Sequence, residues 1–117
     1  MYSTTSRQLK LSTKDELFII DLEKVIYMQA DDHYTHVFYS ATSHFMVPFG
    51  LGSIEEKLGN DPQPQFIRLG RKYIINLHAV FRVSTIKESL FLTDIGSPVE
   101  LHVSKPVLRS LIELLKE

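Results

Sequence analysis

Short runs of β-branched and aromatic residues, separated by polar turn residues, constrain the fold more than any other feature of the sequence. Such runs favour strands. We predict strands over residues 9–11, 17–20, 25–30, 35–39, 45–49, 66–69, 73–76, 80–84, 90–93 and 99–103. Within residues 26–30 the even-numbered positions are apolar, which predicts that Ile26, Met28 and Ala30 are buried on one face of a strand. The sequence therefore predicts a mostly β protein.

Two segments carry helical signals instead. Ser53 and Glu56 have the spacing of a capping box, and Gly59 follows as a terminator, so we predict a short middle helix. A second helix is predicted at the C-terminus, with Ser104 as its N-cap and Pro106 in its first turn. Its apolar residues recur at helical spacing and form one stripe: Val107, Leu108, Leu111, Leu114 and Leu115.

Length and composition bound the class of protein. A chain of 117 residues with 44% hydrophobic and 23% charged residues predicts one folded domain, which we place at residues 9–117 after a flexible lead-in at residues 1–8. The absence of cysteine excludes disulfides and cysteine-ligated metals. The sequence has no apolar run near the ~18 residues of a membrane span and no apolar signal-peptide stretch. We therefore expect a cytoplasmic protein with no membrane partner.

The histidines and the motif content give little support to catalysis. His33 and His36 are three residues apart, a spacing that points to opposite faces of a strand, and His44, His78 and His102 are scattered. The sequence also contains neither a G-x-S-x-G nucleophile elbow nor a phosphate-binding glycine loop. We expect no enzyme activity, no cofactor and no metal site, although a small enzyme or metal protein remains an alternative.

The formal net charge of −1 hides an uneven distribution along the chain. Residues 1–65 carry five basic and nine acidic side chains, whereas residues 66–109 carry seven basic and three acidic side chains. Such asymmetry is typical of a surface that binds nucleic acid. Ordinary solvated surfaces also produce imbalances of this size, so charge alone leaves the question open.

Three polar segments are candidates for contact with a polyanion. Residues 31–36 form a turn rich in hydrogen-bonding groups, and residues 70–72 interrupt two strands with a glycine and two cations. Residues 104–105 lie at a strand-to-helix junction, where free backbone N–H groups and the helix dipole favour a phosphate. Arginine forms paired hydrogen bonds to guanine edges or phosphates, while lysine mainly supplies charge. Each segment alone resembles an ordinary polar turn, but together they favour DNA binding.

These segments carry a resemblance to a known family. Residues 25–37 resemble the opening signature of LytTR (LytR/AlgR-type) DNA-binding domains, in which a strand ends in an acidic, polar turn. Residues 66–77 are similar to the second signature, F-x-R-x-H-R-S-Y-x-V-N, and residues 101–105 with the following leucine-rich helix are similar to the closing segment. The resemblance runs from about Leu9 to Leu115, nearly the whole chain.

The resemblance implies both a fold and a function. The fold is all-β, with short antiparallel strands in packed sheets and small helices. The function is sequence-specific binding of double-stranded DNA in bacterial transcription regulation, through inter-strand loops that enter successive major grooves and bend the site. Family members typically occupy paired direct repeats upstream of promoters, which implies a homodimer on DNA. Many carry an N-terminal receiver domain, so a missing receiver domain or a separate sensor is an expected partner.

The resemblance also assigns DNA-binding residues by position. They are His33, Tyr34 and His36 in the first segment, Arg71 and Lys72 in the second, and Lys105 in the third. Arg68 matches a common family residue that contacts DNA or supports the fold. The chain departs from the family pattern with Gly70 in place of the usual His, Lys72 in place of Ser and Lys105 in place of Arg. The main alternative is a protein-interaction module that kept the fold and lost DNA binding.

Overall fold

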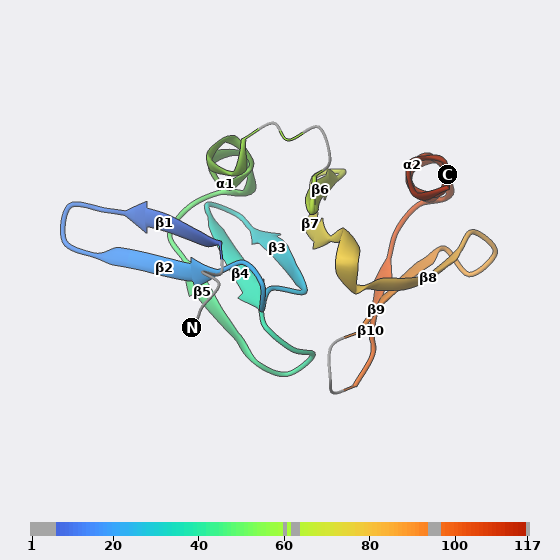
Figure 1. The fold of residues 1–117 in the computed structure, drawn as a ribbon, viewed down its shortest axis with the longest axis horizontal. Helices are drawn as coiled ribbons and strands as arrows, with labels where there is room; N and C mark the ends of the chain where they lie inside the picture. Colours follow the sequence, from blue (N-terminus) through green and yellow to red (C-terminus); the bar gives the residue numbers. More distant parts are fainter. Residues whose placement is uncertain (1–6, 60, 62–63, 94–96, 117) are drawn as a thin grey trace, which may run out of the picture.

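A five-stranded antiparallel sheet forms the centre of the computed structural model, which describes residues 7–59, 61, 64–93 and 97–116 (Figure 1). Its strand order is β5-β4-β3-β7-β6. The strands are β3 (Tyr27–Asp31), β4 (Tyr34–Phe38), β5 (His44–Val47), β6 (Phe66–Leu69) and β7 (Tyr73–Asn76). Most of the lead-in predicted at residues 1–8 lies outside the described residues, and its flexibility stays a prediction.

One face of the central sheet is covered by a hairpin and a helix. The hairpin joins β1 (Gln8–Ser12) to β2 (Leu17–Asp21), and the helix is α1 (Leu51–Leu58). Their apolar side chains enclose a first core cluster with the sheet residues Met28 and Ile74. Because this face packs against two elements, Met28 is completely buried.

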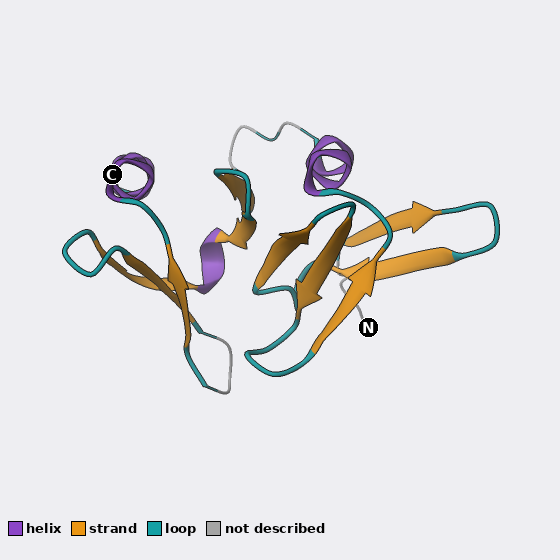
Figure 2. Ribbon diagram, turned by 180° about the vertical axis from the view of Figure 1, so that it is seen from behind, coloured by secondary structure: helices purple, strands orange, loops and turns teal. Residues whose placement is uncertain are grey.

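The opposite face packs against a second sheet and the C-terminal helix. After a short 3-10 turn, η1 (Leu77–Ala79), this sheet is formed by β8 (Val80–Ser84), β9 (Ser89–Leu92) and β10 (Val99–His102), in the order β10-β9-β8. Together with α2 (Lys105–Leu115) it encloses a second core cluster that includes Tyr27 and Ile75 of the central sheet. The central sheet therefore lies between two layers, as Figure 2 shows from behind.

The sequence located the strands, but it was only partly right about the burial of β3, because Met28 and Ala30 pack in the first cluster as predicted and Ile26 does not. Each predicted strand overlaps an observed one, with ends that agree within two residues. Ile26 and Met28 do not share a face, because Ile26 precedes the strand and joins the second cluster while Met28 belongs to the first. Tyr27 is also buried. A strand between two layers buries both of its faces, so the expected alternation of polar and apolar residues is lost.

The predicted capping box is wrong as well. Helix α1 begins at Leu51, its N-cap is Gly50 without a side-chain hydrogen bond, and Ser53 lies inside the helix. Gly59 ends the helix as predicted, with a φ of 76° that favours glycine. The helix begins earlier because Leu51 is buried in the first cluster.

Helix α2 begins as predicted, but its apolar stripe is only partly buried. Ser104 is the N-cap residue, although its side chain makes no capping hydrogen bond, and Pro106 lies in the first turn. Leu108 and Leu111 are buried, whereas Leu114 and Leu115 are 53% and 41% exposed. The last turn of the helix therefore extends beyond the core.

Burial of Tyr27 predicts a dependence of stability on alkaline pH. Desolvation, together with the neighbouring Tyr73, raises the pKa of Tyr27 from 10.0 to about 12. The folded protein thus favours the neutral phenol, and this stabilisation is present below about pH 10 and is lost between about pH 10 and 12. Melting temperatures measured over this range are expected to fall less steeply for Tyr27→Phe than for the parent. Parallel curves for the two proteins would contradict the assignment.

Candidate nucleic-acid interface

The first candidate segment is the tip of the β3–β4 hairpin. The last paired residues are Asp31 and Tyr34, so Asp32 and His33 form a two-residue turn. Asp32 has a φ of 57°, a left-handed value that aspartate tolerates better than most residues. The His33 side chain is 91% exposed and Tyr34 is 45% exposed. Both are therefore accessible to a ligand.

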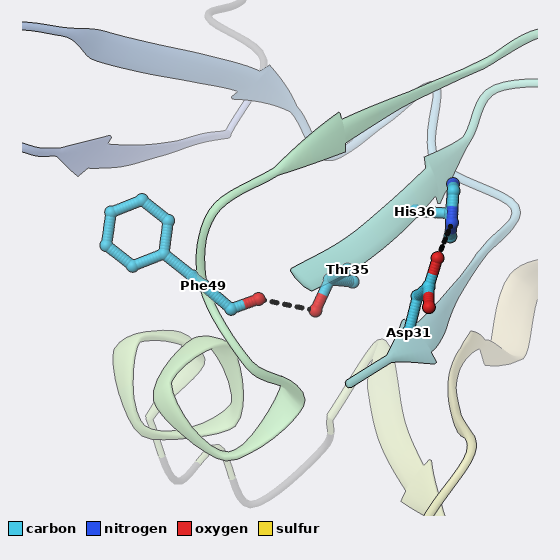
Figure 3. Close-up of polar contacts among 4 residues, drawn as sticks. All are labelled: Asp31, Thr35, His36 and Phe49. Atoms are coloured by element: carbon cyan, nitrogen blue, oxygen red, sulfur yellow. Dashed lines mark hydrogen bonds and ion pairs between the residues drawn. The ribbon is translucent and has the colours of Figure 1, made fainter. Parts of the chain in front are cut away.

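His36 lies further back, on the face of the central sheet. Its Nε2 lies 2.8 Å from Asp31 Oδ2 (Figure 3), and its ring lies 5.0 Å from that of His44. Its Nδ1 is buried and has no hydrogen-bond partner among the described residues. These contacts hold His36 against the stem of the hairpin. We therefore infer that His36 supports the tip and is less available to a ligand than His33.

Thr35 anchors the same hairpin from the opposite face. It is completely buried, and its Oγ1 donates a 2.7 Å hydrogen bond to the Phe49 carbonyl (Figure 3). Phe49 precedes Gly50, the N-cap of α1. This bond therefore ties the hairpin to the start of α1.

The second candidate segment is the turn between β6 and β7. Leu69 pairs with Tyr73, which leaves residues 70–72 as the turn. Gly70 has a φ of 62°, a left-handed conformation that glycine adopts without strain. Arg71 and Lys72 are both exposed. The glycine thus permits a tight turn that presents two cations to solvent.

A backbone hydrogen bond joins the first two segments. Because β3 and β7 are antiparallel neighbours, the end of β3 lies beside the start of β7. The Ala30 N–H donates to the Lys72 carbonyl over 2.8 Å. Both turns therefore lie at the same end of the central sheet, an arrangement that no local sequence motif could have indicated.

The third segment lies beside the second. A cavity of about 140 Å³ is lined by residues 69–73 on one side and by residues 102–104 and Val107 on the other. Lys105 is exposed at the N-terminus of α2, where backbone N–H groups lack partners within the helix. The cavity thus brings the β6–β7 turn and the start of α2 together.

The cations of these segments are available for a ligand. Arg71, Lys72 and Lys105 form no ion pair with any described residue. Lys72 Nζ lies 5.7 Å from the centroid of the Tyr73 ring, a weak cation–π contact. An array of unpaired cations on turns and at a helix N-terminus is suited to phosphate and base edges.

The described part of the chain offers neither a metal-ligating cluster nor a helix that could span a membrane. No group of three or more His, Asp or Glu side chains there could hold a metal ion. Neither α1 nor α2, the two α-helices in the described ranges, has the length and apolar character that a membrane crossing requires.

A mostly β chain that presents a polar hairpin turn and two cationic segments at one end has the features of a DNA-binding domain, and comparison with known proteins agrees. Residues 15–116 match the model of the LytTR family, the LytTr DNA-binding domain. The chain is 34% identical over 93 residues to the CO-responsive transcriptional regulator RcoM of Rhodospirillum rubrum, covering 78% of this chain and 37% of that protein. A solved LytTr DNA-binding domain from Bacillus cereus superposes with a TM-score of 0.64 at 25% identity, covering 97% of this chain and all of that one.

The chain therefore belongs to the LytTR family of DNA-binding domains, which act in transcription regulation. The match confirms the resemblance inferred from the signatures and the mostly β fold with its short middle and C-terminal helices. It does not assign the individual DNA-binding residues. The chain spans about a third of the length of the Rhodospirillum rubrum regulator.

Proposed function

We propose that this domain recognises specific promoter sequences in double-stranded DNA by placing its inter-strand turns in the major groove. The observation that carries the proposal is the convergence of the three polar segments. The β3–β4 and β6–β7 turns are joined by the Ala30–Lys72 hydrogen bond, and the second turn shares a cavity with the start of α2. Segments held at one end of a sheet contact a single DNA duplex together.

The residues divide by chemistry into base-reading and phosphate-binding groups. Arg71 has the paired donors that match the O6 and N7 atoms of guanine, and His33 and Tyr34 offer hydrogen bonds from the hairpin tip. Lys72 and Lys105 supply positive charge to phosphates, and the N–H groups at the start of α2 favour the same ligand. His36 contributes from the stem of the hairpin, where it holds the tip that carries His33 and Tyr34.

Further features of the proposal follow the family pattern. The domain acts as a homodimer on paired direct repeats in the cytoplasm, and a receiver domain or separate sensor supplies its signal. It works by binding, without catalysis or a cofactor. The matched transcriptional regulator is longer than this domain, because the match covers only 37% of it. This supports a domain that works together with other domains.

Selection of bound duplexes from a random DNA pool tests the proposal. A sequence-specific regulator enriches a short motif, which is then bound far more tightly than scrambled DNA of the same composition. Its affinity should also fall steeply as salt rises, because phosphate contacts release counterions. If the folded protein enriches no sequence and shows no salt-dependent DNA binding, the proposal is wrong. The domain is then better explained as a protein-interaction module.

Replacement of Lys105 tests the phosphate contact. Lys105→Ala should weaken binding of the selected and the scrambled duplex by a similar factor and reduce the slope of log K against log salt by about one. Lys24→Ala is the matched control, because Lys24 is exposed and precedes β3 at the end opposite the β3–β4 turn. Titration of both duplexes at several salt concentrations gives the slopes. Identical slopes for Lys105→Ala and Lys24→Ala would remove Lys105 from the interface.

A further inference from the structure

Arg68 connects α1 to the β6–β7 turn. It lies on β6, and its side chain is 28% exposed. The Nε group donates a 3.1 Å hydrogen bond to the Gly70 carbonyl, and Nη1 donates a 3.0 Å hydrogen bond to Glu55 Oε1 on α1. One planar guanidinium therefore bridges a helix and a turn. Both of its contacts are charge-assisted, which makes them stronger than hydrogen bonds between neutral groups.

The carbonyl that Arg68 holds belongs to the peptide unit that leads into Arg71. A peptide unit is planar, so fixing the direction of the Gly70 carbonyl also fixes the direction of the Arg71 N–H. Gly70 has no side chain to restrain the turn, and a Cβ built at this position would meet nothing within 4 Å. The turn thus lacks packing at Gly70, and the bond from Arg68 restrains it instead.

We propose that Arg68 and Glu55 are positioning residues, which hold the β6–β7 turn in the orientation that Arg71 needs to read a base. This inference rests on the proposed function and extends it, because it assigns a role in DNA recognition to an acidic residue of α1. Arg68 acts through the turn, since its Nε donates to the Gly70 carbonyl and its Nη1 donates to Glu55. Glu55 restrains Arg68 in the rotamer that reaches the turn.

If Glu55 only repelled DNA, its replacement would change DNA affinity in the direction opposite to the one that our inference predicts. Removing a carboxylate near a polyanion strengthens DNA binding if the carboxylate only repels phosphates. Removing a carboxylate that positions Arg68 weakens specific binding, because the turn is then less restrained. The sign of the effect therefore separates the two roles.

The test compares Glu55→Gln with Glu56→Gln. Glu56 is the next residue of α1, is exposed and makes no ion pair with any described residue, so its replacement removes the same charge nearby. The measured quantity is the ratio of affinities for the selected and the scrambled duplex. Partial unfolding lowers both affinities equally and cancels in this ratio, so a purely structural role would leave it unchanged.

Glu55→Gln should lower this ratio by roughly two- to fivefold, the range of an exposed ion pair, because the amide oxygen still accepts from Arg68 but carries no charge, while Glu56→Gln leaves the ratio at the parent value. Arg68→Lys should lower it as well, because a single ammonium lacks the planar fork that bridges both partners. Equal ratios for Glu55→Gln, Glu56→Gln and the parent would overturn the inference. A salt slope reduced by about one in Arg68→Gln, which removes the charge, together with tighter binding by Glu55→Gln, would make Arg68 a direct phosphate contact instead.

A measurement without DNA separates this inference from the proposed function. Amide hydrogen exchange reports local opening of the backbone. The Ala30 amide, which is protected by its hydrogen bond to the Lys72 carbonyl of the turn, should exchange faster in Glu55→Gln than in Glu56→Gln or the parent. If this difference is present and the parent prefers no DNA sequence, the restraint on the turn stands and the proposed function fails. If exchange is the same in all three proteins, the restraint itself is absent.

Discussion

Truncation of Leu108 to alanine is expected to lower the free energy of unfolding by about 2–5 kcal/mol. Leu108 is completely buried in the second core cluster, where α2 packs against the β8–β10 sheet and the central sheet. The substitution removes apolar contacts and leaves a cavity that the surrounding residues fill only in part. Equilibrium unfolding in urea, with the midpoint and slope fitted separately, measures the change.

The same helix supplies a control for this prediction. Leu114→Ala is an identical substitution at a position that is 53% exposed, and it should change the free energy of unfolding by less than about 0.5 kcal/mol. A similar loss in both variants would contradict the prediction, because alanine favours a helix at least as well as leucine and only burial distinguishes the two positions. The Leu108→Ala variant should also bind DNA less well, because the helix that Leu108 anchors begins at Lys105.

The positions of the strands could be predicted because local residue preference and burial agree there. Tyr73–Asn76 is a strand in the sequence pattern and in the structure, and all four of its residues are buried. The layers could not be predicted in the same way. Tyr27 and Met28 are adjacent and enter different core clusters, and only the covering elements from distant parts of the chain explain why both are buried.

At the start of α1, tertiary packing determines where the helix begins, and the local capping motif does not. Ser53 and Glu56 fit the capping-box pattern, yet burial of Leu51 extends the helix toward Gly50, which places Ser53 inside it. The capping pattern uses information from four consecutive residues. The burial of Leu51 depends on contacts with β strands far along the chain, which the pattern does not contain.

The candidate interface was predictable in its segments but not in its internal contacts. Signature matching located His33, Arg71 and Lys105, and the structure brings their segments to one end of the molecule. The bond between Ala30 and Lys72 joins residues far apart in sequence, so no local signal could have indicated it. The sequence also left the role of Arg68 open between DNA contact and support of the fold, and its hydrogen bonds favour support.

Arg71→Ala is expected to weaken binding of the selected DNA site by about 1–3 kcal/mol, or roughly 5- to 150-fold, if Arg71 pairs with a guanine. The loss should be much smaller for scrambled DNA, because only a matched base offers the paired acceptors. Arg82→Ala is the matched control. Arg82 is an exposed arginine on β8 that packs over the Phe91 ring at 4.8 Å, outside the three segments. Equal affinities of the two variants for the selected site would remove Arg71 from the interface.

A second substitution at the same position separates base reading from charge. Arg71→Lys keeps the positive charge but cannot form the paired hydrogen bonds of a guanidinium. If Arg71 reads a guanine, the lysine variant should lose most of the preference for the selected site while its salt slope stays near the parent value. If Arg71 contacts only a phosphate, the lysine variant should bind both duplexes nearly as the parent does. The affinity ratio of the two duplexes, measured at one salt concentration, therefore decides which contact Arg71 makes.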